Sequence, residues 1–389
     1  MSSVVGHFGA LLRDAPTRAA AYVFFANGFV YANWVVRIPS IKDELDLGEA
    51  ALGVALLGMA VGGIVAMPLV GALIARLGSA RVVGVAGLAY CCLYWLPGAA
   101  ASMALLTLAL FVVGACNGAM DVAMNAQADA VERVTGLRLM SFCHAMFSLG
   151  LAGGTIPAGF LAAWRLDPAL HLLGVGLLVG LGLLVVRKRF VVDPPGENDG
   201  QPAFALPRGP LLALGLICLC GAIAEGSMND WITVYVHDSL ALGPVNAAVA
   251  YGAFSAAMLA ARLLGDVVTG RFGSVLAVRG GLVLAAVGLA LAMTGWLVAV
   301  VIGFAMVGLG VAGVFPAVFR AAGRVPGHAP GPSMAAAVTL GYAGFLLGPP
   351  IIGFVAEATN LGFGLGAVIP ICLVGVMLAG ALRVADDKA

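Results

Sequence analysis

The chain has 389 residues, of which 62% are hydrophobic and only 10% are charged. Soluble domains carry roughly 25% charged residues, so this composition excludes a soluble fold of the same size. The mean hydropathy of +1.06 predicts a protein that is solvated by lipid. A net charge of +1 offers no electrostatic basis for binding nucleic acid.

The apolar stretches predict a series of membrane-spanning helices. About 20 apolar residues are needed for a helix to cross the hydrocarbon layer. Residues 1–18 lack an apolar core with a cleavage site, and we interpret them as a short cytoplasmic tail. Breaks at charges, prolines and turn residues predict twelve spans: 18–38, 49–75, 81–98, 102–127, 139–163, 169–187, 210–236, 245–270, 275–294, 297–320, 333–356 and 362–383.

One connection is longer and more polar than the others. Residues 188–209 contain Asp193-Pro-Pro-Gly-Glu-Asn-Asp-Gly200 and lie almost at the midpoint of the chain. Such a Pro- and Gly-rich segment is typical of a linker. We therefore predict an N-terminal six-helix half (1–187), a cytoplasmic linker (188–209) and a C-terminal six-helix half (210–389).

Lysine and arginine predict the orientation in the membrane. Cytoplasmic loops of membrane proteins carry an excess of these residues. With both termini inside, seventeen of the twenty cations fall on the cytoplasmic side. All five tryptophans then fall near the outer ends of odd-numbered spans, where we interpret them as interfacial anchors. The expected location is the cell inner membrane.

The two halves contain similar segments at a nearly constant offset, which indicates duplication of a six-helix unit. Both copies face the same way because each has an even number of spans. The predicted fold class is an all-α integral membrane protein with two pseudo-symmetric halves. The matching pairs are Arg76-Leu-Gly78-Ser79 with Arg271-Phe-Gly273-Ser274, Asn33-Trp34 with Asp230-Trp231, Gly159-Phe160 with Gly353-Phe354, and Gly114 with Gly308.

The segment from Gly71 to Arg81 resembles the loop between helices 2 and 3 of the major facilitator superfamily, except that Ala75 replaces the usual acid. Further stretches resemble the YbjJ/MosC-like branch, which is related to the fucose:proton symporters. The resemblance implies the superfamily fold and a small polar solute, sugar-like or inositol-like, that moves with protons. The stretches are Asn27-Gly28 to Pro39, Asn117 to Ala126, Glu225 to Trp231, and Gly348 to Phe354.

Two acids lie well inside predicted spans, Asp121 in helix 4 and Glu225 in helix 7. Ionisable groups inside a membrane are costly and usually functional. Neither acid has a basic residue within one turn of its own helix, so each is a candidate proton-coupling site. The alternative is a structural carboxylate that is satisfied by neighbouring helices.

Polar side chains at helical spacing predict a solute-binding surface. Residues four apart on a helix share one face, and lipid does not tolerate a stripe of amides and carboxylates. Amides, a phenol and an indole suit a polyhydroxylated ligand; the alternative roles are interhelical hydrogen bonding and, for Trp34, interfacial anchoring. The candidate substrate-binding residues are Asn27, Tyr31, Trp34, Asn117, Asn125, His144, Asn229 and Asp230.

Charged residues at the cytoplasmic ends of helices, four arginines and one aspartate, predict a conformational latch. The candidates are Arg76 and Arg81 in the first half, with Arg262, Asp266 and Arg271 in the second. We assign Arg262 to this latch and not to ligand binding.

The expected function is secondary active transport of a small polar solute by a monomer in the lipid bilayer, with proton-coupled symport. The alternatives are proton-coupled efflux of drugs or metabolites and a membrane sensor that moves no solute. The chain lacks a phosphate-binding loop, a nucleophile motif and metal-ligand spacing. We therefore expect no enzyme activity, no cofactor, no metal and no nucleic-acid partner.

Overall fold

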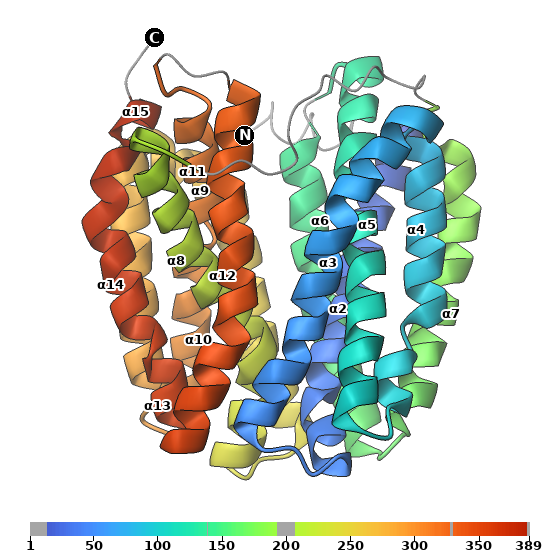
Figure 1. Ribbon diagram of the computed structural model, residues 1–389, viewed down its shortest axis with the longest axis vertical. Helices are drawn as coiled ribbons and strands as arrows, with labels where there is room; N and C mark the ends of the chain where they lie inside the picture. The colour runs from blue at the N-terminus through green and yellow to red at the C-terminus, as the bar shows by residue number, and fades with distance from the viewer. Residues whose placement is uncertain (1–13, 138, 193–206, 327–329, 387–389) are drawn as a thin grey trace.

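The computed structural model describes residues 14–137, 139–192, 207–326 and 330–386 (Figure 1). Within these ranges every regular element is a helix. Twelve helical stretches are long and apolar enough to cross a membrane, which confirms the predicted number of spans. Several helices run beyond the predicted apolar segments, because their last turns carry charged residues that need not lie in lipid. Asp129 and Arg133 near the end of α5 (Met103–Thr135) are examples.

The N-terminal half contains the first six spans. Its helices alternate in direction and form one bundle, seen in blue to green in Figure 1. Its elements are α2 (Ala15–Glu44), α3 (Glu49–Leu77), α4 (Ser79–Leu93), η1 (Leu96–Ala99), α5 (Met103–Thr135), α6 (Met140–Ala163), α7 (Pro168–Val186) and η2 (Arg187–Arg189).

The C-terminal half contains the other six spans, and most of the predicted linker between the halves lies outside the described residues. Its long helix α9 supplies two spans, and α10 with α11 supplies one. Its elements are α8 (Pro210–Val234), η3 (Tyr235–Ser239), α9 (Pro244–Ala292), α10 (Leu297–Val311), α11 (Val314–Ala322), α12 (Pro330–Ala358), α13 (Leu361–Gly366), α14 (Val368–Leu378), η4 (Ala379–Leu382) and α15 (Arg383–Asp386).

The predicted duplication is visible in the backbone. Gly78 separates α3 from α4 with φ 79° and ψ 155°, and Gly273 breaks α9 with φ 76° and ψ 161°. This region of conformational space is essentially restricted to glycine. Gly114 and Gly308, another matched pair, each lie against a backbone carbonyl of a neighbouring helix, so that a Cβ would approach that oxygen to 2.1 and 2.2 Å.

The two ends of the bundle differ in how the halves meet. We call the end where α2 begins and α15 finishes the terminal end, and the opposite end, with the connection 45–48, the far end (Figure 1). Near the far end, the Thr233 hydroxyl donates across the halves to the Val35 carbonyl at 2.8 Å. The Ala50 N–H donates to the Glu357 carboxylate at 3.3 Å. The far end is therefore closed by bonds between the halves.

Two of the five tryptophans contradict their interpretation as interfacial anchors. Trp34 is 1% exposed and Trp231 is 0% exposed, whereas Trp164 and Trp296 are 75% and 66% exposed. The reason is the position of their helices. In the spans formed by α2 and by α8 with η3, 78% of the most apolar window is buried by protein, more than in any other span. Trp34 and Trp231 on these central helices are therefore surrounded by protein and do not reach the membrane surface.

Candidate solute-binding site

A cavity of about 270 Å³ lies between the two halves. Its wall is formed by α2, α3, α5 and α6 from the N-terminal half and by α8 and α12 from the C-terminal half. The helical spacing that placed the polar residues on common faces also directs them to this space. Of the predicted site residues, the cavity is lined by Asn27, Tyr31, Asn117, Asp121, Glu225, Asn229 and Asp230.

Three predicted substrate-binding residues do not line the cavity. Trp34 is buried, and its backbone N–H donates to the Tyr94 hydroxyl at 3.2 Å. The Asn125 amide donates to the backbone carbonyl of Asp121 at 2.8 Å, one turn earlier on its own helix. His144 packs edge to face against the ring of Phe24, with centroids 5.2 Å apart.

On the N-terminal side, polar atoms of the cavity wall lack protein partners. The Asn117 Oδ1 atom is buried and accepts no hydrogen bond from any described residue. Among the described residues, the Asn27 amide has the Met124 sulfur as its single partner, at 3.7 Å. A buried carbonyl oxygen without a donor is costly, so this wall is suited to a ligand that supplies hydrogen-bond donors.

On the C-terminal side, the polar groups are mostly paired. Arg262 Nη2 lies 3.2 Å from Glu225 Oε1, and Arg262 Nη1 donates to the Ser148 hydroxyl at 2.7 Å. The Tyr251 hydroxyl donates to Asn229 Oδ1 at 3.0 Å. Arg262 therefore joins α9 to α8 in its own half and to α6 in the other half.

Glu225 has no basic residue within one turn of its own helix, but it has a basic partner, Arg262, on another helix. The partner lies 37 residues away on α9, beyond the reach of an argument that considered one helix at a time. The Arg262 guanidinium contacts Glu225 and Ser148, so this predicted latch residue bridges the two halves beside the cavity, and its latch role stays a prediction. By contrast, the Asp121 and Asp230 carboxylates make no hydrogen bond or ion pair with another described residue, and both line the cavity.

The cavity also has an aromatic and methionine lining that the sequence analysis missed. Tyr342 and Phe345 of α12 and Phe147 of α6 border the space. Phe345 stacks on Phe315 with centroids 5.9 Å apart. Uncharged residues in apolar helices give no compositional signal. The only available sign in the sequence was the i, i+3 spacing of Tyr342 and Phe345 among the glycines of α12.

Among the latch candidates whose side chains the structure describes, Arg76, Arg81 and Arg271 form no ion pair with a described acid. Arg271 lies with its Cζ 5.6 Å from the ring centroid of Phe272. The Asp266 side chain lies outside the described part. The latch role of these four residues stays a prediction.

A contact that sequence reasoning missed lies at the terminal end. The Asp386 carboxylate accepts the Ser274 N–H at 2.8 and 2.9 Å, just after the Gly273 break. Arg324 Nη1 donates to the Ala385 carbonyl at 2.5 Å. The end of α15 is therefore tied to two connections of its own half.

Comparison with known proteins decides the family. The model of the Major Facilitator Superfamily matches residues 20–349. The chain belongs to the major facilitator superfamily. This superfamily chain is 35% identical over 352 residues to an uncharacterized MFS-type transporter of Yersinia pestis, which covers 89% of this chain and 90% of the relative. It is 33% identical over 368 residues to the membrane protein MosC of Rhizobium meliloti, with 93% and 88% covered.

Solved structures show the same superfamily fold. A bacterial homologue of the human lysosomal transporter Spinster, in an inward-facing and occupied conformation, aligns with a TM-score of 0.70 at 15% identity, covering 95% of both chains. The nucleoside transporter NupG aligns with a TM-score of 0.72 at 14% identity, covering 95% of this chain and 99% of that one. The protein is thus a multi-pass membrane protein of a transporter superfamily, whose members bind small-molecule solutes within the membrane.

Proposed function

We propose that the protein is a secondary active transporter that carries a small polar organic solute, sugar-like or inositol-like, together with protons. The proposal places it as a monomer in the cell inner membrane, with both termini cytoplasmic. One observation carries it: carboxylates from both halves, Asp121 on α5 and Glu225 on α8, line a single cavity between those halves.

The lining supports the class of solute. Asn27 and Asn117 offer amide groups that protein atoms leave largely unused. Tyr342 and Phe345 offer flat apolar surface on the opposite wall. A ring that carries hydroxyl groups presents donors and acceptors at its rim and an apolar face, and it would use both walls.

The contacts of Glu225 support coupling to protons. When Glu225 is ionised, its carboxylate holds Arg262 at 3.2 Å, and Arg262 also binds Ser148 of the other half. A proton on Glu225 removes the charge that holds the guanidinium. The contact between the halves then weakens, which links protonation to the relative movement that alternating access requires.

The first prediction concerns the two cavity acids. The solute is first selected by thermal-shift screening against sugars, inositols, amino acids and drugs, and its uptake into proteoliposomes is then measured. A proton gradient directed inward, with the lower pH outside the proteoliposomes, should drive uptake by the native protein. Glu225→Gln should abolish that drive while solute exchange across the membrane continues, because exchange needs no net proton release. Asp121→Asn is expected to reduce driven uptake at least tenfold.

A matched control is Asp129→Asn, an exposed acid two turns further along α5, which should retain native uptake. Driven uptake that is unchanged in both Glu225→Gln and Asp121→Asn would contradict the proposal. The sign of the proton flux separates symport from efflux by antiport. Solute binding without any flux would instead indicate a sensor.

A further inference from the structure

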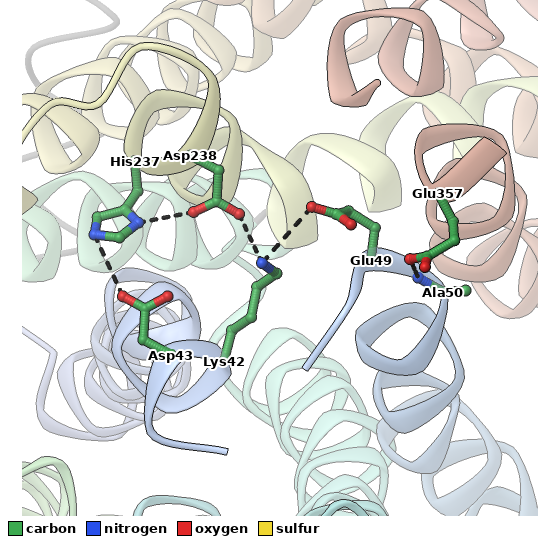
Figure 2. A network of polar contacts seen from close by, with 7 residues as sticks. All are labelled: Lys42, Asp43, Glu49, Ala50, His237, Asp238 and Glu357. Atoms are coloured by element: carbon green, nitrogen blue, oxygen red, sulfur yellow. Dashed lines mark hydrogen bonds and ion pairs between the residues drawn. The ribbon is translucent and has the colours of Figure 1, made fainter. Parts of the chain in front are cut away.

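A charged network joins residues at the far end of the bundle, and none of its members lines the cavity (Figure 2). Asp238 Oδ2 lies 2.9 Å from Lys42 Nζ, which is also 3.7 Å from Glu49 Oε1. His237 Nδ1 lies 2.8 Å from Asp238 Oδ1, and His237 Nε2 lies 3.6 Å from Asp43 Oδ2. The imidazole is thus placed between two carboxylates.

The network joins the two halves of the protein. Lys42 and Asp43 are on the last turns of α2, whereas His237 and Asp238 are in the widened helical turn η3 that follows α8. The contacts of Lys42 with Asp238 and of Asp43 with His237 can exist only while the far ends of α2 and α8 are together. Opening the far end must therefore break them.

The other elements packed against η3 add no charge to the network. α9 carries no acid, base or histidine between Pro244 and Ala261, and α13 carries none at all. On α3 the facing acid is Glu49, which binds Lys42, and on α12 Glu357 binds the Ala50 N–H. His237 is therefore the only histidine at this contact among the described residues, and its ring carries a charge only when it is protonated.

The charge on the imidazole decides how many carboxylates it can bind. A neutral imidazole has a single N–H and can donate to only one acid, whereas its other nitrogen presents a lone pair. The protonated ring has an N–H on each side. It can bind Asp238 through Nδ1 and Asp43 through Nε2 at once, and its charge is attracted to both carboxylates.

We propose that His237 is a proton-operated lock on the far end, which holds α2 to η3 when the imidazole is protonated. This lock is distinct from Asp121 and Glu225 and does not require solute. In the closed form two acids face the imidazole, and in the open form Asp43 has moved away. The factor by which closure strengthens proton binding is then the factor by which protons favour closure. Lower pH therefore closes the far end, and higher pH releases it.

The test measures the separation of the far ends directly. Spin labels are placed at Leu166→Cys and Thr359→Cys, two exposed far-end positions in opposite halves, with the seven native cysteines replaced. The full chain is studied in lipid nanodiscs by pulsed electron resonance, without solute and with EDTA to remove metal ions. Asp121→Asn, Glu225→Gln and Asp230→Asn are included in the background so that the cavity acids cannot cause the response.

When the pH is lowered from 8 to 5, we expect the ratio of closed to open far ends to rise about fivefold. This value is at the lower end of typical couplings because the His237 side chain is partly exposed. His237→Gln should remove the pH response and leave the far end less closed at pH 5. His237→Lys should keep the far end closed at both pH values. Lys42→Gln should lower the closed fraction at every pH but retain the response.

Two outcomes would overturn the proposal. One is a native distance distribution that does not change between pH 5 and pH 8. The other is a His237→Gln variant whose response equals that of the native residue. Because transport is not measured, these outcomes are independent of whether Glu225 couples to protons.

Discussion

Arg262 shows most clearly how a single residue can connect the binding cavity to the interface between the halves. Its guanidinium is 20% exposed and its partner Glu225 is 12% exposed. A pair this shielded is costly to break on one side, because the remaining charge stays in the protein without a counterion. Glu225 and Arg262 should therefore act as a unit.

The second prediction tests this unit by a double-mutant cycle. Arg262→Ala should destabilise the protein by about 1–3 kcal/mol, since it leaves Glu225 unpaired. Adding Glu225→Gln should recover part of that loss, because the unpaired charge is removed. The measurement is thermal unfolding of purified protein in one detergent.

The matched control is Arg133→Ala, whose pair with Asp129 is 61% and 52% exposed and should matter little. Additive effects of the two substitutions at 225 and 262 would show that the pair is not an energetic unit.

At the scale of elements, the break at Gly273 divides α9 into two spans. Its backbone has φ 76°, and an added Cβ would lie 3.1 Å from the Asp386 carboxylate. The Asp386 bonds to the Ser274 N–H begin one residue later. The turn therefore depends both on glycine and on the docking of α15.

The third prediction is that Gly273→Ala destabilises the protein by about 1–3 kcal/mol, the usual cost of this backbone region for a residue with a side chain. Gly270→Ala is the control, because Gly270 is helical and an added Cβ meets nothing within 4 Å. Thermal unfolding compares the two. Equal melting temperatures would show that the break at Gly273 tolerates a side chain.

At the scale of the whole molecule, the conformation is closed at the far end and bridged deeper in the bundle by Arg262. The far-end bonds join α2 to the end of α8 and to η3, that is, the first span of one half to the first span of the other. The predicted orientation places this end outside the cell, so the proposed His237 lock would sense external protons.

The fourth prediction tests that orientation. In a cysteine-free background, Thr359→Cys at the far end should react with a membrane-impermeant maleimide in intact cells. Arg133→Cys, exposed at the terminal end, should react only after the cells are opened. Labelling of Arg133→Cys alone in intact cells would reverse the assignment of both sides.

The sequence by itself determined the twelve spans, the duplication and the polar faces of the central helices. Each of these depends on local patterns. A span needs an unbroken apolar run because lipid offers no hydrogen bonds, and helical periodicity places Asn117 and Asp121 on one face. These patterns were sufficient to predict most of the polar residues that line the cavity.

Only the tertiary structure decided which residues are paired. The contact of Glu225 with Arg262, the position of His237 between Asp43 and Asp238, and the burial of Trp34 all depend on how separate helices pack. Periodicity gives the face of a helix but not its neighbour. The partner of a charge, and therefore its chemistry, is set by the arrangement of the two halves.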